Sequence, residues 1–204
     1  MKYPNSRLLL FTKAPEPGKV KTRLAAFLGT DAAAELYESL LHDCLEMCVT
    51  ADLCPVEICC SPSTGHDFFQ QCRERYHTTL QQQAEGDIGQ RMSRAIMSAL
   101  QRAEHVVLIG ADCPALTADD LDNAFYALQQ GTDVVLGPAK DGGYYLIGMS
   151  SHHPGLFENI PWSTHRVLAA TETLLREQCL SWHLLPLYRD VDTAEDYSVY
   201  MATN

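Results

Sequence analysis

The chain has 204 residues, of which 46% are hydrophobic and 20% are charged, values that are ordinary for a soluble globular protein. This length favours one domain with a substantial core, and the formal net charge of -11 argues against general nucleic-acid binding, which needs a basic face. The N-terminal apolar run, about five residues long, is too short for a signal peptide or a membrane span, so a cytoplasmic location without membrane contact is expected.

Strand and helix patterns alternate along the whole chain. Strands are predicted at residues 8–12, 56–60, 78–83, 106–109, 134–136, 144–148 and 182–187, and helices at residues 30–50, 67–76, 87–103, 117–130, 163–179 and 193–201. Thr117 and Asp120 form a near capping box, and Ser163 or Thr164 is the expected cap of the next helix. A tight turn at residues 141–143 predicts that the strand after it runs antiparallel.

This alternation predicts an α/β fold, a three-layer α/β/α sandwich with a mixed, mostly parallel sheet. Sheets of this type bind ligands at the carboxyl ends of their strands, at a topological switch point. Each segment that carries candidate chemistry falls at such a strand end. The eight cysteines include no CxxC pair, and most of them are expected to be small buried thiols.

The first candidate site is the basic loop after the first predicted strand. Six of the fifteen Lys and Arg residues lie among the first 23 residues, where Glu16 is the one acid. A Pro/Gly turn is surrounded by four of them, Lys13, Lys19, Lys21 and Arg23, and the pattern then turns helical. A cationic loop between a strand and a helix N-terminus is suited to bind a phosphate. The alternative is an ordinary basic surface loop.

The next candidate site is acidic. Asp112 follows the buried strand at residues 106–109, where a carboxylate would hold a hard divalent cation or would cap a turn. The segment after the last strand offers Asp190 or Asp192 as a second metal ligand opposite Asp112. Alternatively, Asp192 caps the last helix, with Glu195 completing a capping box.

Two further loops complete the candidates. Gly86 and Gly89 flank Asp87 and suit a close approach to a flat ring or sugar, although Asp87 is equally suited to cap a helix. Arg91, one turn into that helix, would reach a phosphate or face solvent. Trp162 would stack on a substrate ring or belong to the core or its rim.

The turn at residues 141–143 is either a hairpin turn without a ligand or one wall of an acceptor site. In the second case, the backbone N–H groups of Gly142 and Gly143 would be exposed to the acceptor. Asp141 is the candidate general base, a role that requires reach to the acceptor proton.

Five segments, taken in chain order, resemble nucleotide-diphospho-sugar transferases with the GT-A fold. They are KAPEPGKVKTRL at residues 13–24, GDIGQR at 86–91, GADCP at 110–114, KDGGYY at 140–145 and DVDTAED at 190–196. The likeness is specific to a bacterial family of small proteins labelled radical-SAM/selenodomain-associated transferase or arsenosugar-type glycosyltransferase. More distantly, the chain is similar to molybdenum-cofactor and phospholactate guanylyltransferases. The resemblance implies a single GT-A-like domain over residues 1–204.

The resemblance also implies roles for individual residues. The nucleotide phosphates would be lined by Lys13, Gly18, Lys21 and Arg23, and the base or ribose would lie near Gly86 and Asp87. Asp112 and Asp192 would hold Mg²⁺ or Mn²⁺. The acceptor or transferred group would face Gly142, Gly143 and Tyr144, beside Asp141 and Trp162.

The expected reaction is metal-dependent transfer from a nucleotide-activated donor, with a glycosyl group from a nucleotide-diphosphate sugar to a small-molecule acceptor as first choice. Lys21, Arg23 and Asp112 would be the catalytic residues, because they would stabilise the charge that develops on the departing diphosphate. The alternative enzyme is a nucleotidylyltransferase that joins an NTP to a phosphorylated acceptor and releases pyrophosphate. A non-catalytic nucleotide-binding module is a further alternative, and a homodimer is left open.

Overall fold

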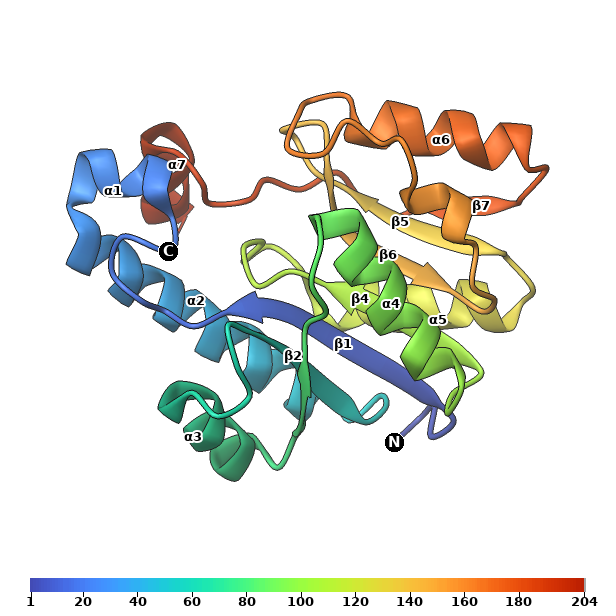
Figure 1. Cartoon of the computed structure of the whole chain (residues 1–204), viewed down its shortest axis with the longest axis horizontal. Helices are drawn as coiled ribbons and strands as arrows, with labels where there is room; N and C mark the ends of the chain where they lie inside the picture. The colour runs from blue at the N-terminus through green and yellow to red at the C-terminus, as the bar shows by residue number, and fades with distance from the viewer. Residues whose placement is uncertain (204) are drawn as a thin grey trace.

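The computed structural model describes residues 1–203 and is built on a seven-stranded sheet in the order β3-β2-β1-β4-β6-β5-β7 (Figure 1). The strands are β1 Ser6–Lys13, β2 Val56–Ser61, β3 Thr79–Gln82, β4 His105–Ile109, β5 Val134–Pro138, β6 Tyr144–Met149 and β7 Trp182–Leu184. Strand β6 runs antiparallel to its neighbours β4 and β5, whereas the other pairs are parallel. The predicted mixed, mostly parallel sheet is therefore confirmed, together with its antiparallel strand.

Helices cover both faces of this sheet. They are α1 Thr22–Leu28, α2 Thr30–Thr50, α3 Asp67–Tyr76, α4 Ile88–Leu100, α5 Ala118–Gln129, α6 Val167–Glu177 and α7 Ala194–Thr203, with a 3₁₀ turn η1 at Pro154–Phe157. Helices α2, α3 and α5 pack on one face, and α4 and α6 pack on the other. This arrangement is the predicted three-layer α/β/α sandwich. Helices α1 and α7 lie side by side beyond the sheet edge (Figure 1).

The two halves of the core follow from the alternation of side chains along buried strands. In β1, Leu8 and Leu10 join the cluster under α2 and α5, whereas Leu9 joins the cluster under α4. Strand β4 alternates in the same way, with Val107 and Ile109 on the α2 side. Because these strands are buried on both faces, they are apolar at consecutive positions, as parallel strands in such sandwiches are.

The position of β1 creates a reversal of strand order at the carboxyl ends of the central strands. The chain proceeds from β1 to β2 and β3 on one side, and β4 then pairs with β1 on the other side. This reversal of strand order is the topological switch point at which α/β sheets bind ligands. Since β1 and β4 are parallel, the loops at residues 14–21 and 110–117 leave the sheet at the same edge.

Several predicted boundaries are wrong, among them the end of the helix predicted at residues 87–103, which stops at Leu100. Helix α6 begins at Val167, and neither Ser163 nor Thr164 caps it: Ser163 has a φ of 61°, and the hydroxyl of Thr164 donates to the Pro161 carbonyl at 2.6 Å. These residues form a turn that precedes the helix. Strand β7 ends at Leu184 and does not extend to residue 187.

The predicted burial of most cysteines is confirmed by Cys48, Cys54, Cys59, Cys60, Cys72 and Cys113. None of the helices formed within residues 1–203 is both long and apolar enough to cross a membrane.

Candidate functional site

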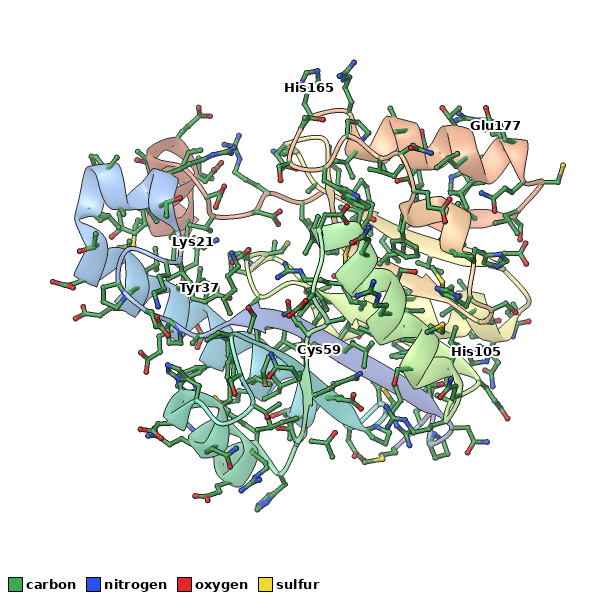
Figure 2. The ribbon with its side chains drawn as sticks, viewed as in Figure 1. Lys21, Tyr37, Cys59, His105, His165 and Glu177 are labelled. Carbon is green, nitrogen blue, oxygen red and sulfur yellow. The ribbon has the colours of Figure 1, made fainter. Side chains whose placement is uncertain are left out.

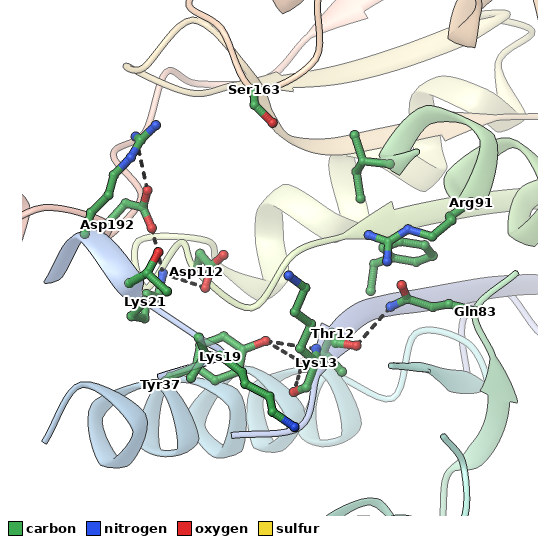
Figure 3. Close-up of a pocket in the computed structure, with 15 residues that line it drawn as sticks. Thr12, Lys13, Lys19, Lys21, Tyr37, Gln83, Arg91, Asp112, Ser163 and Asp192 are labelled. Atoms are coloured by element: carbon green, nitrogen blue, oxygen red, sulfur yellow. Dashed lines mark hydrogen bonds and ion pairs between the residues drawn. The ribbon is translucent and has the colours of Figure 1, made fainter. Parts of the chain in front are cut away.

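Lys21 lies at the centre of the candidate site, between two carboxylates (Figure 3). Its Nζ is 2.7 Å from Asp112 Oδ1 and 3.7 Å from Asp192 Oδ1. The side chain of Lys21 is 3% exposed, whereas those of Asp112 and Asp192 are 43% and 46% exposed. The ammonium is thus withdrawn from water, while each carboxylate keeps an open side on which a ligand can bind.

The loop that precedes α1 holds Lys21 in an unusual conformation. Lys21 has a φ of 46°, in the left-handed region that L residues rarely adopt. Earlier in the loop, Gly18 has a φ of 77°, and the Lys19 N–H donates to the Glu16 carbonyl at 3.0 Å. Strain of the kind seen at Lys21 persists where the surroundings hold a residue in place, and the two carboxylates do so here.

Tyr37 on α2 supports both Lys21 and the end of β1. Its hydroxyl accepts a hydrogen bond from the Lys13 N–H at 3.1 Å and lies 2.7 Å from Thr12 Oγ1. Its ring centroid is 5.8 Å from Lys21 Nζ, within cation–π range, and the two side chains lie near each other in Figure 2. Burial raises the pKa of the Tyr37 phenol, so the hydroxyl stays protonated at neutral pH.

A second segment, between β7 and α7, brings further carboxylates to the site. The Val191 N–H donates to the Asp112 carbonyl at 2.9 Å and ties this segment to the loop after β4. Arg23 Nη1 lies 3.4 Å from Asp192 Oδ2. Burial, together with the nearby charge of Asp112, raises the pKa of the Asp190 carboxyl to about 7. The segment therefore sets an acidic group opposite the basic loop.

The alternative in which Asp192 caps the last helix is wrong, because the capping box is formed one residue later. The Thr193 N–H and hydroxyl donate to Asp196 Oδ2 at 2.9 and 2.7 Å, and the Asp196 N–H donates to Thr193 Oγ1 at 3.3 Å. Glu195 pairs with Arg189 at 3.1 Å. The Asp192 carboxylate is thereby left without a capping role and faces the basic loop.

Three adjoining hollows open on the site and share Arg23, Asp112 and Asp192. The first, of about 450 Å³, is lined by five basic side chains, Lys13, Lys19, Lys21, Arg23 and Arg91. The second, of about 360 Å³, is lined by further acids, Asp141, Asp190 and Asp196. The third, of about 620 Å³, is more apolar, and its walls include Met92, Tyr144, Ile147 and Trp162. The first hollow has the charge that a phosphorylated ligand requires.

The carboxylates fit a divalent cation that the protein and a ligand hold together. Among residues 1–203, no group of three or more His, Cys, Asp and Glu side chains is arranged to hold a metal by itself. Mg²⁺ commonly binds through one or two carboxylates and substrate phosphates. Asp112 and Asp192 supply two carboxylates beside the basic hollow, and Asp190 Oδ1 is buried nearby without a hydrogen-bond partner in the described chain.

Comparison with known proteins identifies the family of the chain. The family model DUF2064, described as an uncharacterized protein conserved in bacteria, matches residues 44–164. The chain belongs to this family. A solved structure from Desulfovibrio desulfuricans G20, provisionally named a nucleotide-diphospho-sugar transferase, is 35% identical with a TM-score of 0.90, and the alignment covers 98% of this chain and 88% of that one. No curated protein matches the chain significantly.

More distant solved structures share the fold. CMP:2-keto-3-deoxy-manno-octonic acid synthetase, complexed with CTP, is 9% identical with a TM-score of 0.60, over 98% of this chain and 99% of that one. Glucosyl-3-phosphoglycerate synthase from Mycobacterium tuberculosis, in complex with Mn²⁺, UDP and glucosyl-3-phosphoglycerate, is 10% identical with a TM-score of 0.59, over 98% of this chain and 76% of that one. The DUF2064 chain is a transferase-like enzyme with a GT-A-like fold, as its motifs predicted.

Most of the residues proposed from the sequence lie together around the three hollows. Those that line a hollow are Lys13, Lys21, Arg23, Asp112, Asp141, Gly143, Tyr144, Trp162 and Asp192. Those outside the lining are Gly18, Gly86, Asp87 and Gly142. Asp87 caps α4, because its Oδ1 accepts a hydrogen bond from the Gln90 N–H at 2.8 Å.

Two glycines of the predicted motifs accommodate other parts of this DUF2064 chain. A Cβ on Gly89 would overlap the indole of Trp162, so the flat ring that approaches the first turn of α4 belongs to the protein itself. Gly142 has a φ of 89°, and a Cβ there would overlap the carbonyl of His165. The turn at residues 141–143 therefore packs against the loop before α6.

Sequence reasoning gave no site role to Tyr37 or Gln83, although both line the basic hollow. Tyr37 matches the apolar stripe of a helix. That pattern does not predict that the Tyr37 hydroxyl contacts the end of β1. Gln83 closes a strand pattern in which polar residues are ordinary. The contact partners of both residues lie more than one element away in the sequence.

Proposed function

We propose that this protein transfers a glycosyl group from a nucleotide-diphosphate sugar to a small-molecule acceptor, using Mg²⁺ or Mn²⁺ held by Asp112 and Asp192. The observation that carries the proposal is the buried Lys21 ammonium between these two carboxylates. It lies where a basic hollow, suited to a diphosphate, meets a more apolar hollow, suited to a sugar and its acceptor.

The basic loop would bind the diphosphate and stabilise its charge as the donor bond breaks. Lys21 is fixed by Asp112 and by the ring of Tyr37 before any ligand arrives, so its charge needs no reorganisation during reaction. Because the ammonium is buried, its attraction for a phosphate oxygen is screened less than at the surface. Lys13 and Arg23 line the same hollow and would add to this stabilisation.

The two half-exposed carboxylates would position a divalent cation against the same phosphates. Such an ion, when bound, would neutralise the negative charge of the departing diphosphate. Asp112 and Asp192 would hold it on the sides that face away from Lys21. Their spacing is fixed by the Lys21 ammonium and by the hydrogen bond from the Val191 N–H to the Asp112 carbonyl.

The third hollow would receive the transferred sugar and the acceptor. The rings of Tyr144 and Trp162 are 6.3 Å apart, edge to face, and both line this hollow. Aromatic side chains with a polar atom suit ligands that are partly apolar and partly hydroxylated. Asp141 lines both the second and the third hollow and is the proposed general base for the acceptor hydroxyl.

The alternative reaction is nucleotidylyl transfer, in which a phosphorylated acceptor attacks an NTP and pyrophosphate leaves. Its support is that the fold is shared about equally with the CTP-bound synthetase and with the UDP-bound glucosyl-3-phosphoglycerate synthase. The basic hollow has enough cationic side chains for a triphosphate as well as for a diphosphate.

The products separate the two reactions. The protein is first screened by thermal shift against nucleotide sugars, nucleoside diphosphates and triphosphates, each with and without Mn²⁺, and ³¹P NMR then identifies the phosphates released. Metal-dependent protection by a nucleotide sugar and release of a nucleoside diphosphate are expected. Pyrophosphate released from a triphosphate would establish the alternative, binding without turnover would indicate a non-catalytic module, and no protection by any nucleotide would refute the proposal.

A further inference from the structure

Gln83 lines the basic hollow directly after β3, and its amide orientation is fixed. Its Nε2 donates to the Thr12 carbonyl at 2.9 Å and to the Cys59 carbonyl at 2.7 Å. Because both partners are acceptors, the amide cannot turn over without placing its own oxygen against two carbonyl oxygens. The amide therefore bridges the ends of β1 and β2, and its oxygen points away from them (Figure 3).

The fixed amide leaves one acceptor atom without a partner. Gln83 is 8% exposed, and its Oε1 is buried with no donor among residues 1–203. A buried polar atom without a partner costs free energy, and native proteins rarely leave one unused. Since Gln83 lines the basic hollow, the missing partner is expected to be an N–H or O–H of the bound ligand.

Arg91 supplies the complementary donor in the same hollow. Its guanidinium is 5.7 Å from the ring centroid of Phe11, and both residues line the cavity with Gln83. Its Nε is buried without a hydrogen-bond acceptor in the described part of the chain. In the view of Figure 3, Gln83 and Arg91 lie on the opposite side of the hollow from Asp112 and Asp192. This is the end at which a base would lie if the phosphates occupy the Lys21 end.

We propose that Gln83 and Arg91 select the nucleobase by reading a lactam edge, that is, a ring N–H beside a carbonyl oxygen, as in guanine and uracil. Gln83 Oε1 would accept from the ring N–H, and the Arg91 guanidinium would donate to the neighbouring carbonyl. In cytosine and adenine the corresponding ring nitrogen has a lone pair and no hydrogen, so it cannot donate a hydrogen bond to Gln83 Oε1. In DNA recognition, donation from Arg or Lys to the O6 and N7 atoms of guanine is the commonest specific contact, so a guanidinium is suited to bind a base carbonyl. The inference rests on the proposed nucleotide-dependent function.

The test measures the affinity of the full chain for UDP, GDP, CDP and ADP by calorimetry in the presence of Mn²⁺. The wild type is expected to bind UDP or GDP at least about tenfold more tightly than CDP and ADP, the discrimination typical of one base-edge contact pair. UDP and GDP are compared directly, so the measurement also separates the two lactam bases. Gln83→Leu is expected to lower the affinity for the preferred diphosphate by about tenfold. The affinities for the other nucleoside diphosphates are expected to change little.

Gln81→Leu is the matched control, because Gln81 Oε1 is also buried without a partner within residues 1–203, but Gln81 lines none of the hollows of the site. Should Gln83→Leu fail to fold, 3-methyluridine or 1-methylguanosine diphosphate tests the same contact on the wild type, since the methyl group replaces the ring N–H. Preference for CDP or ADP, an unchanged preference in Gln83→Leu, or undiminished binding of the methylated base would overturn the inference. If no diphosphate binds the wild type, the proposed function itself fails.

Discussion

Replacement of Lys21 by Met tests the centre of the site, because it removes the buried charge and keeps an unbranched side chain of similar length. A fixed cation that stabilises charge in the transition state contributes about 3–4 kcal/mol, so kcat is expected to fall by about 100- to 1000-fold. The fold should persist, since Asp112 and Asp192 are 43% and 46% exposed and water can solvate both carboxylates once the ammonium is gone. The change in unfolding free energy is expected to stay within about 1 kcal/mol.

The assay combines donor turnover, followed by ³¹P NMR, with urea denaturation of the same preparation. Arg73→Met is the matched control, because Arg73 is exposed on α3 and lines none of the three hollows. It should leave both turnover and stability unchanged. A Lys21→Met protein that keeps kcat within about threefold of wild type would refute the assignment of Lys21 as the stabilising charge. Loss of turnover together with loss of folding would contradict the small change in unfolding free energy expected for Lys21→Met.

Three further predictions concern Asp112, Gly89 and Asp133. Asp112→Asn should lower turnover by at least about tenfold and weaken the Mn²⁺ dependence of nucleotide protection, measured by metal titration in the thermal-shift assay; unchanged metal dependence would remove Asp112 from the metal site. Gly89→Ala should destabilise the fold by about 1–3 kcal/mol in urea, because the new methyl group overlaps the indole of Trp162, and a variant of wild-type stability would contradict this packing. Hydrogen bonds from Ser181 lower the pKa of Asp133, so this contribution to stability is present above the unfolded-state pKa of Asp133 and is lost as the pH falls through the folded-state pKa. Asp133→Asn should therefore flatten the acid limb of the stability profile, and an unaltered limb would count against that contribution.

The sequence predicted most of the fold because the signals involved are local. The capping box that opens α5 needs only Thr117 and Asp120, three positions apart, and both of its hydrogen bonds form. The continuous apolar run of β4 likewise identifies a strand buried on both faces without knowledge of its neighbours. Such local patterns predict the observed elements because the tertiary contacts stabilise the same conformations.

The charged residues that cluster in the candidate site could be proposed from the sequence, whereas their contact partners could not. Asp192 and Thr193 are both able to cap a helix, and the choice depends on Lys21 and Arg23, which attract the Asp192 carboxylate from far away in the sequence. Gly89 signalled a close approach of a ring, but the sequence could not show that the ring is that of Trp162. In each case the deciding contact joins segments whose meeting is fixed by the completed sheet.

The ion pair between Arg23 and Asp192 joins residues 169 positions apart, and this separation has a consequence for biosynthesis. At ribosomal elongation rates, the cationic loop emerges roughly 8 to 34 seconds before the segment that carries its partner carboxylate. During that interval the sheet can begin to form on the nascent chain while the loop remains exposed to cellular anions. Catalytic competence would then be the last property that the protein acquires, after translation has passed Asp192, so premature termination upstream of that point would yield no active enzyme.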